Sequence, residues 1–257
     1  MNDFLARTTA NLPHWAGEAI GVWDDTLLHQ HSDFLRRHYW TESGCINVFC
    51  IKGTAHPDYQ GLSWFEFLHQ GKHMSRNIAL LESSPAYYTA MVTKKPVMCF
   101  NSSKGIEWFT GADGNHRSAL ARFLFHEQEK YCLHGVQLNH YEFNEPLLTI
   151  YLAFLKELSL HTAHGCHVDM NVNRIHRCRE DNPGWKTDFY TTSLYFSTGS
   201  WSRDCHDHLA VSVMTAPLDI TDPNEGWKLL FSLRMWHERR EAKRNDIYSW
   251  LAERRRA

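Results

Sequence analysis

Residues Lys94 to Asn144 read as strand, strand, tight turn, helix and strand, and this succession places both α and β structure around a single turn. The turn, Gly111 to Arg117, has the sequence Gly-Ala-Asp-Gly-Asn-His-Arg and stands directly before an Ala- and Leu-rich segment. Its two glycines allow the backbone to bend and a ligand to approach closely. The free N–H groups at the start of the next helix favour an anion. The sequence therefore predicts that the chemistry lies at this turn.

The elements on either side of the turn have clear local signals. An apolar run at 96–100, a turn cluster at 101–105 and a strand-like run at 106–110 predict a hairpin. The apolar residues after the turn fall at helical spacing, namely Ala119, Leu120, Phe123 and Leu124. Residues 136–143 then alternate with period two, which is typical of a half-buried strand.

This arrangement, with Asp113-Gly114-Asn115-His116-Arg117-Ser118-Ala119 between a strand and a helix, resembles the ParB/sulfiredoxin superfamily over residues 75–145. In that superfamily a Gly-x-x-Arg-type turn at a helix N-terminus holds nucleotide phosphates. The resemblance implies an α+β fold, with a mixed sheet, helices and N- and C-terminal extensions. Asn115 stands where sulfiredoxins have a reactive cysteine, which argues against sulfinic-acid reduction. The second nucleotide motif of ParB partition proteins is not found, which leaves ParB-like nucleases, nucleotide hydrolases and plasmid fertility-inhibition proteins.

Chemical roles can be assigned to the turn as a hypothesis. Phosphate binding is expected at Gly114, Asn115, His116, Arg117 and Ser118. Asp113 is expected to hold Mg²⁺ or Mn²⁺ or to orient water, with His116 transferring a proton and Arg117 neutralising charge on phosphoryl oxygens. ATP or CTP is the expected ligand. The alternative is that Asp113 and Asn115 only form an Asx-type turn and cap the helix.

The net charge of −2 gives no global field that would attract DNA. Residues 234–257 are locally basic, with eight Lys or Arg against four acids, and predict DNA contact at Arg254, Arg255 and Arg256. A solvated helix face with a charged tail is the alternative.

Seven cysteines at irregular spacing predict reduced thiols, and the chain shows neither a signal peptide nor an apolar run long enough for a bilayer. A cytoplasmic location is therefore expected. The 18 histidines include a cluster that could hold a transition metal, with polar surface or buried structural histidines as the alternative. The cluster comprises His161, His164, Cys166, His167, Asp169, His176 and Cys178, followed by Cys205-His206-Asp207-His208.

The expected organisation has three parts. An N-terminal extension over 1–44 includes a helix at 24–39. The ParB/sulfiredoxin-like core covers 45–145, with a strand at 46–51 and two helices within 62–88. A C-terminal extension over 146–257 packs on the core. Its expected elements are a helix at 147–160, an irregular loop at 161–186, strands at 189–197 and 209–215, and a basic helix at 226–256.

Two functional classes follow from the resemblance. The first is a metal-dependent DNase or nucleotide hydrolase with DNA as its partner, acting in plasmid or mobile-DNA biology. The second is a non-catalytic regulator that binds nucleotide or DNA, or that blocks a protein partner in a DNA-transfer system. A metal-binding interaction module at residues 161–178 is a third alternative.

Overall fold

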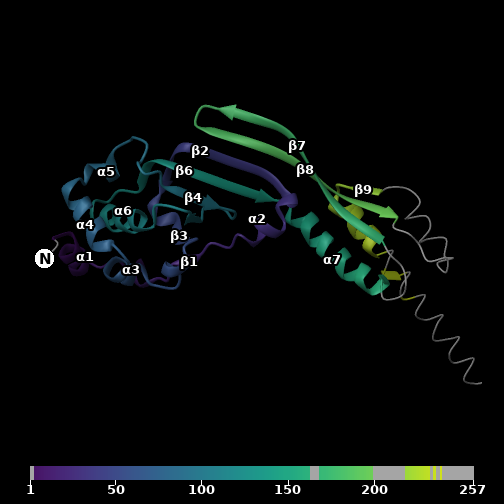
Figure 1. Cartoon of the computed structure of the whole chain (residues 1–257), viewed down its shortest axis with the longest axis horizontal. Helices are drawn as coiled ribbons and strands as arrows, with labels where there is room; N and C mark the ends of the chain where they lie inside the picture. The colour runs from purple at the N-terminus through teal and green to yellow at the C-terminus, as the bar shows by residue number, and fades with distance from the viewer. Residues whose placement is uncertain (1–2, 163–167, 199–217, 232–233, 236–237, 239–257) are drawn as a thin grey trace, which may run out of the picture. The chain divides into compact units, whose positions relative to one another are not determined.

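The computed structural model describes residues 3–162, 168–198, 218–231, 234–235 and 238. The chain forms two compact units that interleave in sequence (Figure 1). The first unit holds residues 1–30, 37–143 and 177–189, and the second holds residues 31–36, 144–176 and 190–257. Both contain helices and strands, so the predicted α+β class is confirmed. The assignment to the ParB/sulfiredoxin fold stays a prediction.

The strands form a mixed sheet in the order β1-β3-β5-β4-β6-β2-β8-β7, with β9 paired to β8. β1 and β3 are parallel, as are β3 and β5 and also β4 and β6, whereas β4 and β5 are antiparallel. The predicted hairpin before the turn is thus confirmed, with Phe100 paired to Thr110. The strands are β1 (Gly21–Val22), β2 (Leu35–Asn47), β3 (Ile51–Thr54), β4 (Cys99–Ser102), β5 (Trp108–Thr110), β6 (Cys132–Phe143), β7 (Val168–Asn182), β8 (Trp185–Thr198) and β9 (Leu218–Ile220).

Helices α3 to α6 of the first unit gather beside strands β3, β4 and β6 (Figure 1). The start of α3 is fixed by a capping box, in which Ser63 Oγ accepts from Glu66 N while the Glu66 carboxylate accepts from Ser63 N. The unit's α-helices are α1 (Asp3–Ala10), α2 (Thr26–Gln30), α3 (Trp64–Gln70), α4 (Met74–Ser83), α5 (Ala86–Thr89) and α6 (Asn115–Glu127). Its 3₁₀ turns are η1 (His14–Gly17), η3 (Val48–Cys50) and η4 (Pro57–Tyr59).

Helix α6 is the central helix of the first unit. Every residue from Ser118 to Phe125 is buried, so the helix has almost no wet face and must be surrounded by other elements. The four apolar residues predicted for its core face all belong to the hydrophobic core, together with β-strand residues such as Phe100 and Leu138. This packing holds the N-terminus of α6 in a fixed place at the end of β5.

The second unit is built around α7 (Glu145–Thr162), which begins next to the 3₁₀ turn η2 (Ser32–Phe34). Asn144 N donates to Phe34 O at 2.8 Å, and the Phe34 and Tyr151 rings lie 5.1 Å apart. Residues 223–231 form a further helical segment. The predicted helix at 147–160 is confirmed, because α7 covers all of these residues.

Three predictions about local structure are wrong. The expected strand at 46–51 is interrupted, because β2 ends at Asn47, η3 covers Val48–Cys50 and β3 begins at Ile51. Only Thr26–Gln30 of the expected helix at 24–39 is α-helical, and β2 begins at Leu35. The expected loop at 161–186 instead contains β7 and the start of β8. The physical reason is non-local pairing, since β2 bonds to β8 in antiparallel register from Arg37 opposite Phe189 to Trp40 opposite Lys186.

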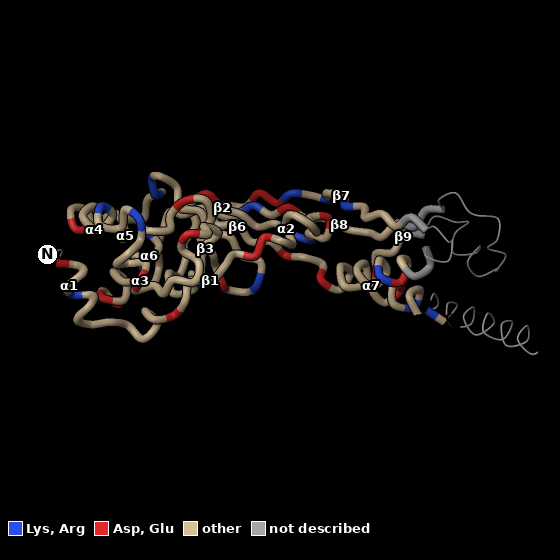
Figure 2. The backbone as a smooth tube through the Cα atoms, turned by 60° about the horizontal axis from the view of Figure 1, so that its bottom comes forward, with Lys and Arg blue, Asp and Glu red and all other residues tan. Residues whose placement is uncertain are grey.

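Several predicted features lie outside the described residues. They are the strand at 209–215, the end of the basic helix after residue 238, and the expected DNA contacts at Arg254, Arg255 and Arg256. Along the part of the chain that the structure describes, Lys and Arg are interspersed with Asp and Glu (Figure 2). No helix within this part is long and apolar enough to cross a membrane.

Candidate functional site

The turn between β5 and α6 is held by two buried residues, Gly114 and Ser118. Gly114 precedes the helix with φ at 113°, a conformation that favours glycine. Ser118 N and Oγ both donate to Gly114 O, at 2.7 and 2.8 Å. Thr110 Oγ1 donates to Ser118 Oγ at 3.3 Å. The Ser118 hydroxyl thus has its partners inside the protein, and its contribution here is to fix the turn.

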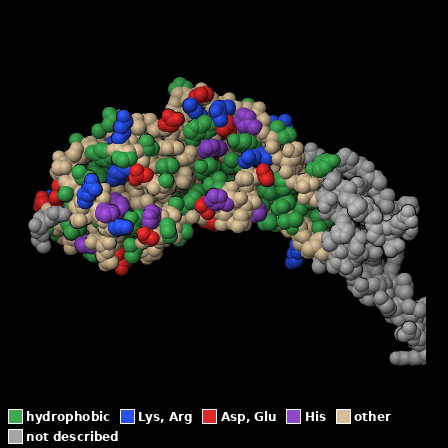
Figure 3. All heavy atoms as spheres, in the orientation of Figure 1, with side chains coloured by type: hydrophobic (Ala, Val, Ile, Leu, Met, Phe, Trp, Pro, Cys, Tyr) green, Lys and Arg blue, Asp and Glu red, His purple; other side chains and the backbone are tan. Residues whose placement is uncertain are grey.

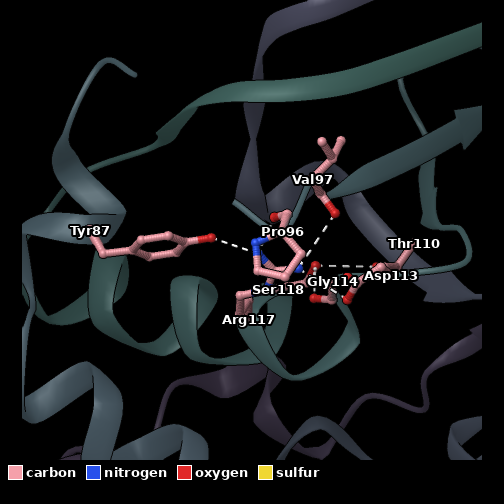
Figure 4. Close-up of polar contacts among 8 residues, drawn as sticks. All are labelled: Tyr87, Pro96, Val97, Thr110, Asp113, Gly114, Arg117 and Ser118. Carbon is pink, nitrogen blue, oxygen red and sulfur yellow. Dashed lines mark hydrogen bonds and ion pairs between the residues drawn. The ribbon is translucent and has the colours of Figure 1, made fainter. Parts of the chain in front are cut away.

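Arg117 is anchored by oxygens from two other segments and by Asp113 of its own turn (Figure 4). Its Nη1 donates to the Tyr87 hydroxyl at 2.6 Å and to Pro96 O, and its Nη2 donates to Val97 O at 3.5 Å. Asp113 Oδ1 lies 3.0 Å from Nη2. The Arg117 side chain is 13% exposed and that of Asp113 is 56% exposed. The guanidinium is therefore held rigidly, and the carboxylate covers its outer side from solvent.

A pocket of about 400 Å³ lies beside this ion pair. Its walls come from α4 and the residue after it, from α5, from the segment before β4, and from the turn itself. The lining is mainly apolar, and its charged side chains are Lys95, Asp113 and Arg117. The full lining comprises Asn77, Leu80, Leu81, Ser83, Ser84, Tyr87, Tyr88, Lys95, Pro96, Asp113 and Arg117.

Asn115 and His116 make contacts with a different part of the unit. Asn115 Oδ1 accepts from Thr54 Oγ1 at the end of β3. His116 Nε2 donates to Lys72 O, and its ring lies 5.3 Å from the Phe67 ring. The predicted residues therefore lie in two different places. Asp113 and Arg117 line the pocket, whereas the side chains of Asn115 and His116 join the start of α6 to β3 and to the region of α3.

Burial lowers the pKa of His116 from its ordinary value and is the largest cause of the shift. The bond to Lys72 O and the charge of Asp113 act in the opposite direction, while His73 and His56 lower the pKa further. A histidine whose pKa is lowered by folding binds protons less readily in the folded chain than in the unfolded chain. Its contribution to stability is therefore present above the ordinary pKa of about 6.5 and is lost as the pH falls below it.

We expect the free energy of unfolding to fall as the pH drops below about 6.5, and we expect His116→Asn to reduce this dependence. His38 and His140 also have pKa values lowered by burial, so part of the dependence should persist in the variant. Urea unfolding at a series of pH values measures the slope. A slope that His116→Asn leaves unchanged would show that this histidine does not carry the effect.

The described residues contain no group of three or more His, Cys, Asp or Glu side chains that could hold a metal ion. Asp113 is the one carboxylate in the pocket lining. In the predicted metal cluster, residues 163–167 lie outside the described chain, while His176 and Cys178 are exposed on β7. Cys205 to His208 also lie outside it. On the face drawn in Figure 3, histidines lie among hydrophobic and charged side chains.

Comparison of the chain with models of protein families, with curated proteins and with solved structures finds no match. The resemblance to the ParB/sulfiredoxin superfamily therefore rests on the turn and its flanking elements, and it stays a prediction. The roles assigned to Asp113, His116 and Arg117 stay predictions as well.

Sequence reasoning did not find the residues that complete the pocket. Tyr87 and Pro96 are 30 and 21 positions from Arg117, yet both bond to its guanidinium. Leu80 lines the pocket and is 57% exposed. It lies on the outer side of α4, whereas the buried apolar residues of this helix lie on its inner side. A large apolar residue on the outer side of α4 is the one sequence signal that could have indicated this wall.

Proposed function

We propose that the protein binds a nucleotide, or the phosphates of DNA, in the pocket beside Arg117. The observation that carries this proposal is the position of the Asp113–Arg117 ion pair at the edge of a largely apolar pocket. A volume of about 400 Å³ is in the range of small-ligand sites. The apolar walls suit a base or sugar, and the cationic edge suits a phosphate.

The ion pair can give way to a ligand. Asp113 is more than half exposed, so its carboxylate can move into solvent when it leaves Arg117. A phosphate that takes the place of the carboxylate gains charge-assisted hydrogen bonds worth roughly 1.5–3 kcal/mol each. A phosphate can therefore compete with the carboxylate for Arg117. Tyr87 and Pro96 keep the guanidinium in position during the exchange, because they bond to Nη1 and Asp113 lies at Nη2.

The enzymatic form of this proposal is a metal-dependent DNase or nucleotide hydrolase acting in plasmid or mobile-DNA biology. One carboxylate does not make a resident metal site, but Mg²⁺ is commonly held by one or two carboxylates together with substrate phosphates. Asp113 would supply the protein ligand for Mg²⁺ or Mn²⁺ carried in with ATP, CTP or DNA. The ion would neutralise charge that develops on the phosphoryl oxygens. The non-catalytic form, a regulator in a DNA-transfer pathway, needs binding alone.

Arg117→Ala is expected to lower affinity for the preferred nucleotide or DNA roughly 100-fold, because charge-assisted bonds to the phosphate are lost. Binding is measured with ATP, CTP and single- and double-stranded DNA, in Mg²⁺, Mn²⁺ or chelator. Arg76→Ala, an exposed arginine on α4, is the matched control. Circular dichroism confirms that each variant is folded. Equal affinity in folded Arg117→Ala would contradict the proposal.

The same samples separate the two forms. Turnover that needs a divalent ion and disappears in Arg117→Ala supports the hydrolase or nuclease. Binding without turnover in either metal supports the regulator. No binding of any of these ligands to the native chain would reject both.

A further inference from the structure

Two cysteines far apart in sequence lie together in the sheet. Cys45 is near the end of β2 and Cys132 is the first residue of β6, and these strands are neighbours in the sheet. The two thiols are close enough for Cys132 to raise the pKa of Cys45. Both residues are exposed, although the Cys45 sulfur itself is partly buried. The backbone beside them is tied together, since Val48 N donates to Tyr131 O at 2.9 Å.

The contact gives the two thiols different roles. The pKa of Cys45 is raised to about 11, with burial as the largest cause and the hydrogen bond and charge of Cys132 as the others. Cys45 therefore keeps its proton at neutral pH. A thiolate is the nucleophile in thiol oxidation, so Cys45 is not expected to make the first attack, and we assign that step to Cys132.

We propose that Cys45 and Cys132 form an oxidative modification site, which hydrogen peroxide converts into an intramolecular disulfide. The Cys132 thiolate attacks one peroxide oxygen, the O–O bond breaks, and hydroxide leaves as the sulfenic acid forms. Cys45 sulfur then attacks the Cys132 sulfur, and the S–O bond breaks as the S–S bond forms. The hydroxyl group and the Cys45 proton leave as water. In total two thiols lose two electrons, and one peroxide becomes two waters.

The other described cysteines make suitable controls. Cys50 and Cys99 are half-buried, and the Cys99 sulfur accepts a hydrogen bond from Asn139 Nδ2 at 3.5 Å. Cys178 is exposed on β7, in a different part of the sheet. If exposure alone decided the product, Cys178 would be oxidised as readily as Cys132. Proximity to a second thiol predicts instead that one pair forms a bond.

The test treats the reduced full-length chain with a small excess of hydrogen peroxide and analyses an unreduced digest by mass spectrometry. The expected product joins the peptides of Cys45 and Cys132, is lighter by two hydrogen atoms and disappears with dithiothreitol. Cys45→Ser should leave a sulfenic acid at Cys132 that a dimedone probe labels, whereas Cys178→Ser should not change the cross-link. The oxidised native chain should also have a higher thermal midpoint, because the bond closes a long loop.

Three outcomes would overturn the proposal. One is an intermolecular disulfide as the main product, and another is sulfinic acid at both cysteines without a cross-link. The third is that the cross-linked Cys45–Cys132 peptide forms only after the chain has been unfolded. The measurement on the native chain decides the question even if a serine variant fails to fold. Because it does not involve the pocket, its outcome is independent of the proposed nucleotide binding.

Discussion

Arg122→Ala is expected to lower the free energy of unfolding by about 3–5 kcal/mol, the range typical of deleting a large core side chain. Arg122 is 1% exposed, and its Cζ lies 4.4 Å from the Trp15 ring and 4.2 Å from the Trp64 ring. Its Nη1 donates to Ile51 O. Alanine would leave a cavity between two indoles and a carbonyl without its donor. Burial also lowers the pKa of Arg122 to about 10, so burial of the charge itself is energetically unfavourable.

Two further variants separate packing from charge. Arg122→Met keeps most of the volume and removes the unfavourable buried charge, so we expect a smaller loss than with alanine. Arg76→Ala, on the exposed side of α4, should change stability by less than about 0.5 kcal/mol. Urea unfolding followed by the fluorescence of the ten tryptophans, which include Trp15 and Trp64, measures the stability of each variant. If the free energy of unfolding of Arg122→Ala equalled that of the native chain, the assignment of Arg122 to the core would be wrong.

Gly135→Ala is expected to cost about 3 kcal/mol, because two independent penalties add. Gly135 has φ at 70°, in the left-handed region, where a side chain costs about 1–2 kcal/mol. A Cβ at this position would lie 1.9 Å from Val92 O, a backbone atom that cannot rotate away. Lys94 N donates to Gly135 O at 2.8 Å, which holds the two segments together.

Gly105→Ala is the matched control for this prediction. Gly105 also has a positive φ, of 55°, but nothing lies within 4 Å of the position of its Cβ. We expect the free energy of unfolding of this variant to fall by roughly 1–2 kcal/mol, which is the cost of the left-handed backbone alone. The difference between the two variants in thermal or urea unfolding gives the cost of the close approach. Equal losses would mean that the 92–94 segment moves away freely.

The sequence predicted the region around the turn well because its signals are local. The hairpin before the turn depends on short apolar runs and turn residues, and α6 depends on apolar spacing after Gly114. β7 was not predicted, because its sequence lacks such local signals. Its residues 173–182 are all exposed and largely polar or charged, so they show no alternation. Such a strand is specified by backbone pairing with its neighbour rather than by a buried face.

The same distinction applies to the candidate site. The position of Arg117 at the start of a helix follows from the glycines before it and the apolar spacing after it. Its contacts with Tyr87, Pro96 and Val97 depend on how α5 and the following segment pack beside the turn. Nothing in the local pattern indicates that packing. Asp113 lies in the turn before the N-cap Gly114, so its pairing with Arg117 depends on the turn conformation and does not follow from helical spacing.

The most direct test of nucleotide binding at the pocket is the affinity of Asp113→Asn, measured by calorimetric titration with the preferred nucleotide in chelator. We expect saturable binding to the native chain and binding about fivefold tighter to the variant, since asparagine no longer competes for Arg117 or repels phosphate. A variant that binds more weakly, or the absence of saturable binding to both proteins, would contradict the claim that phosphate replaces the Asp113 carboxylate at Arg117.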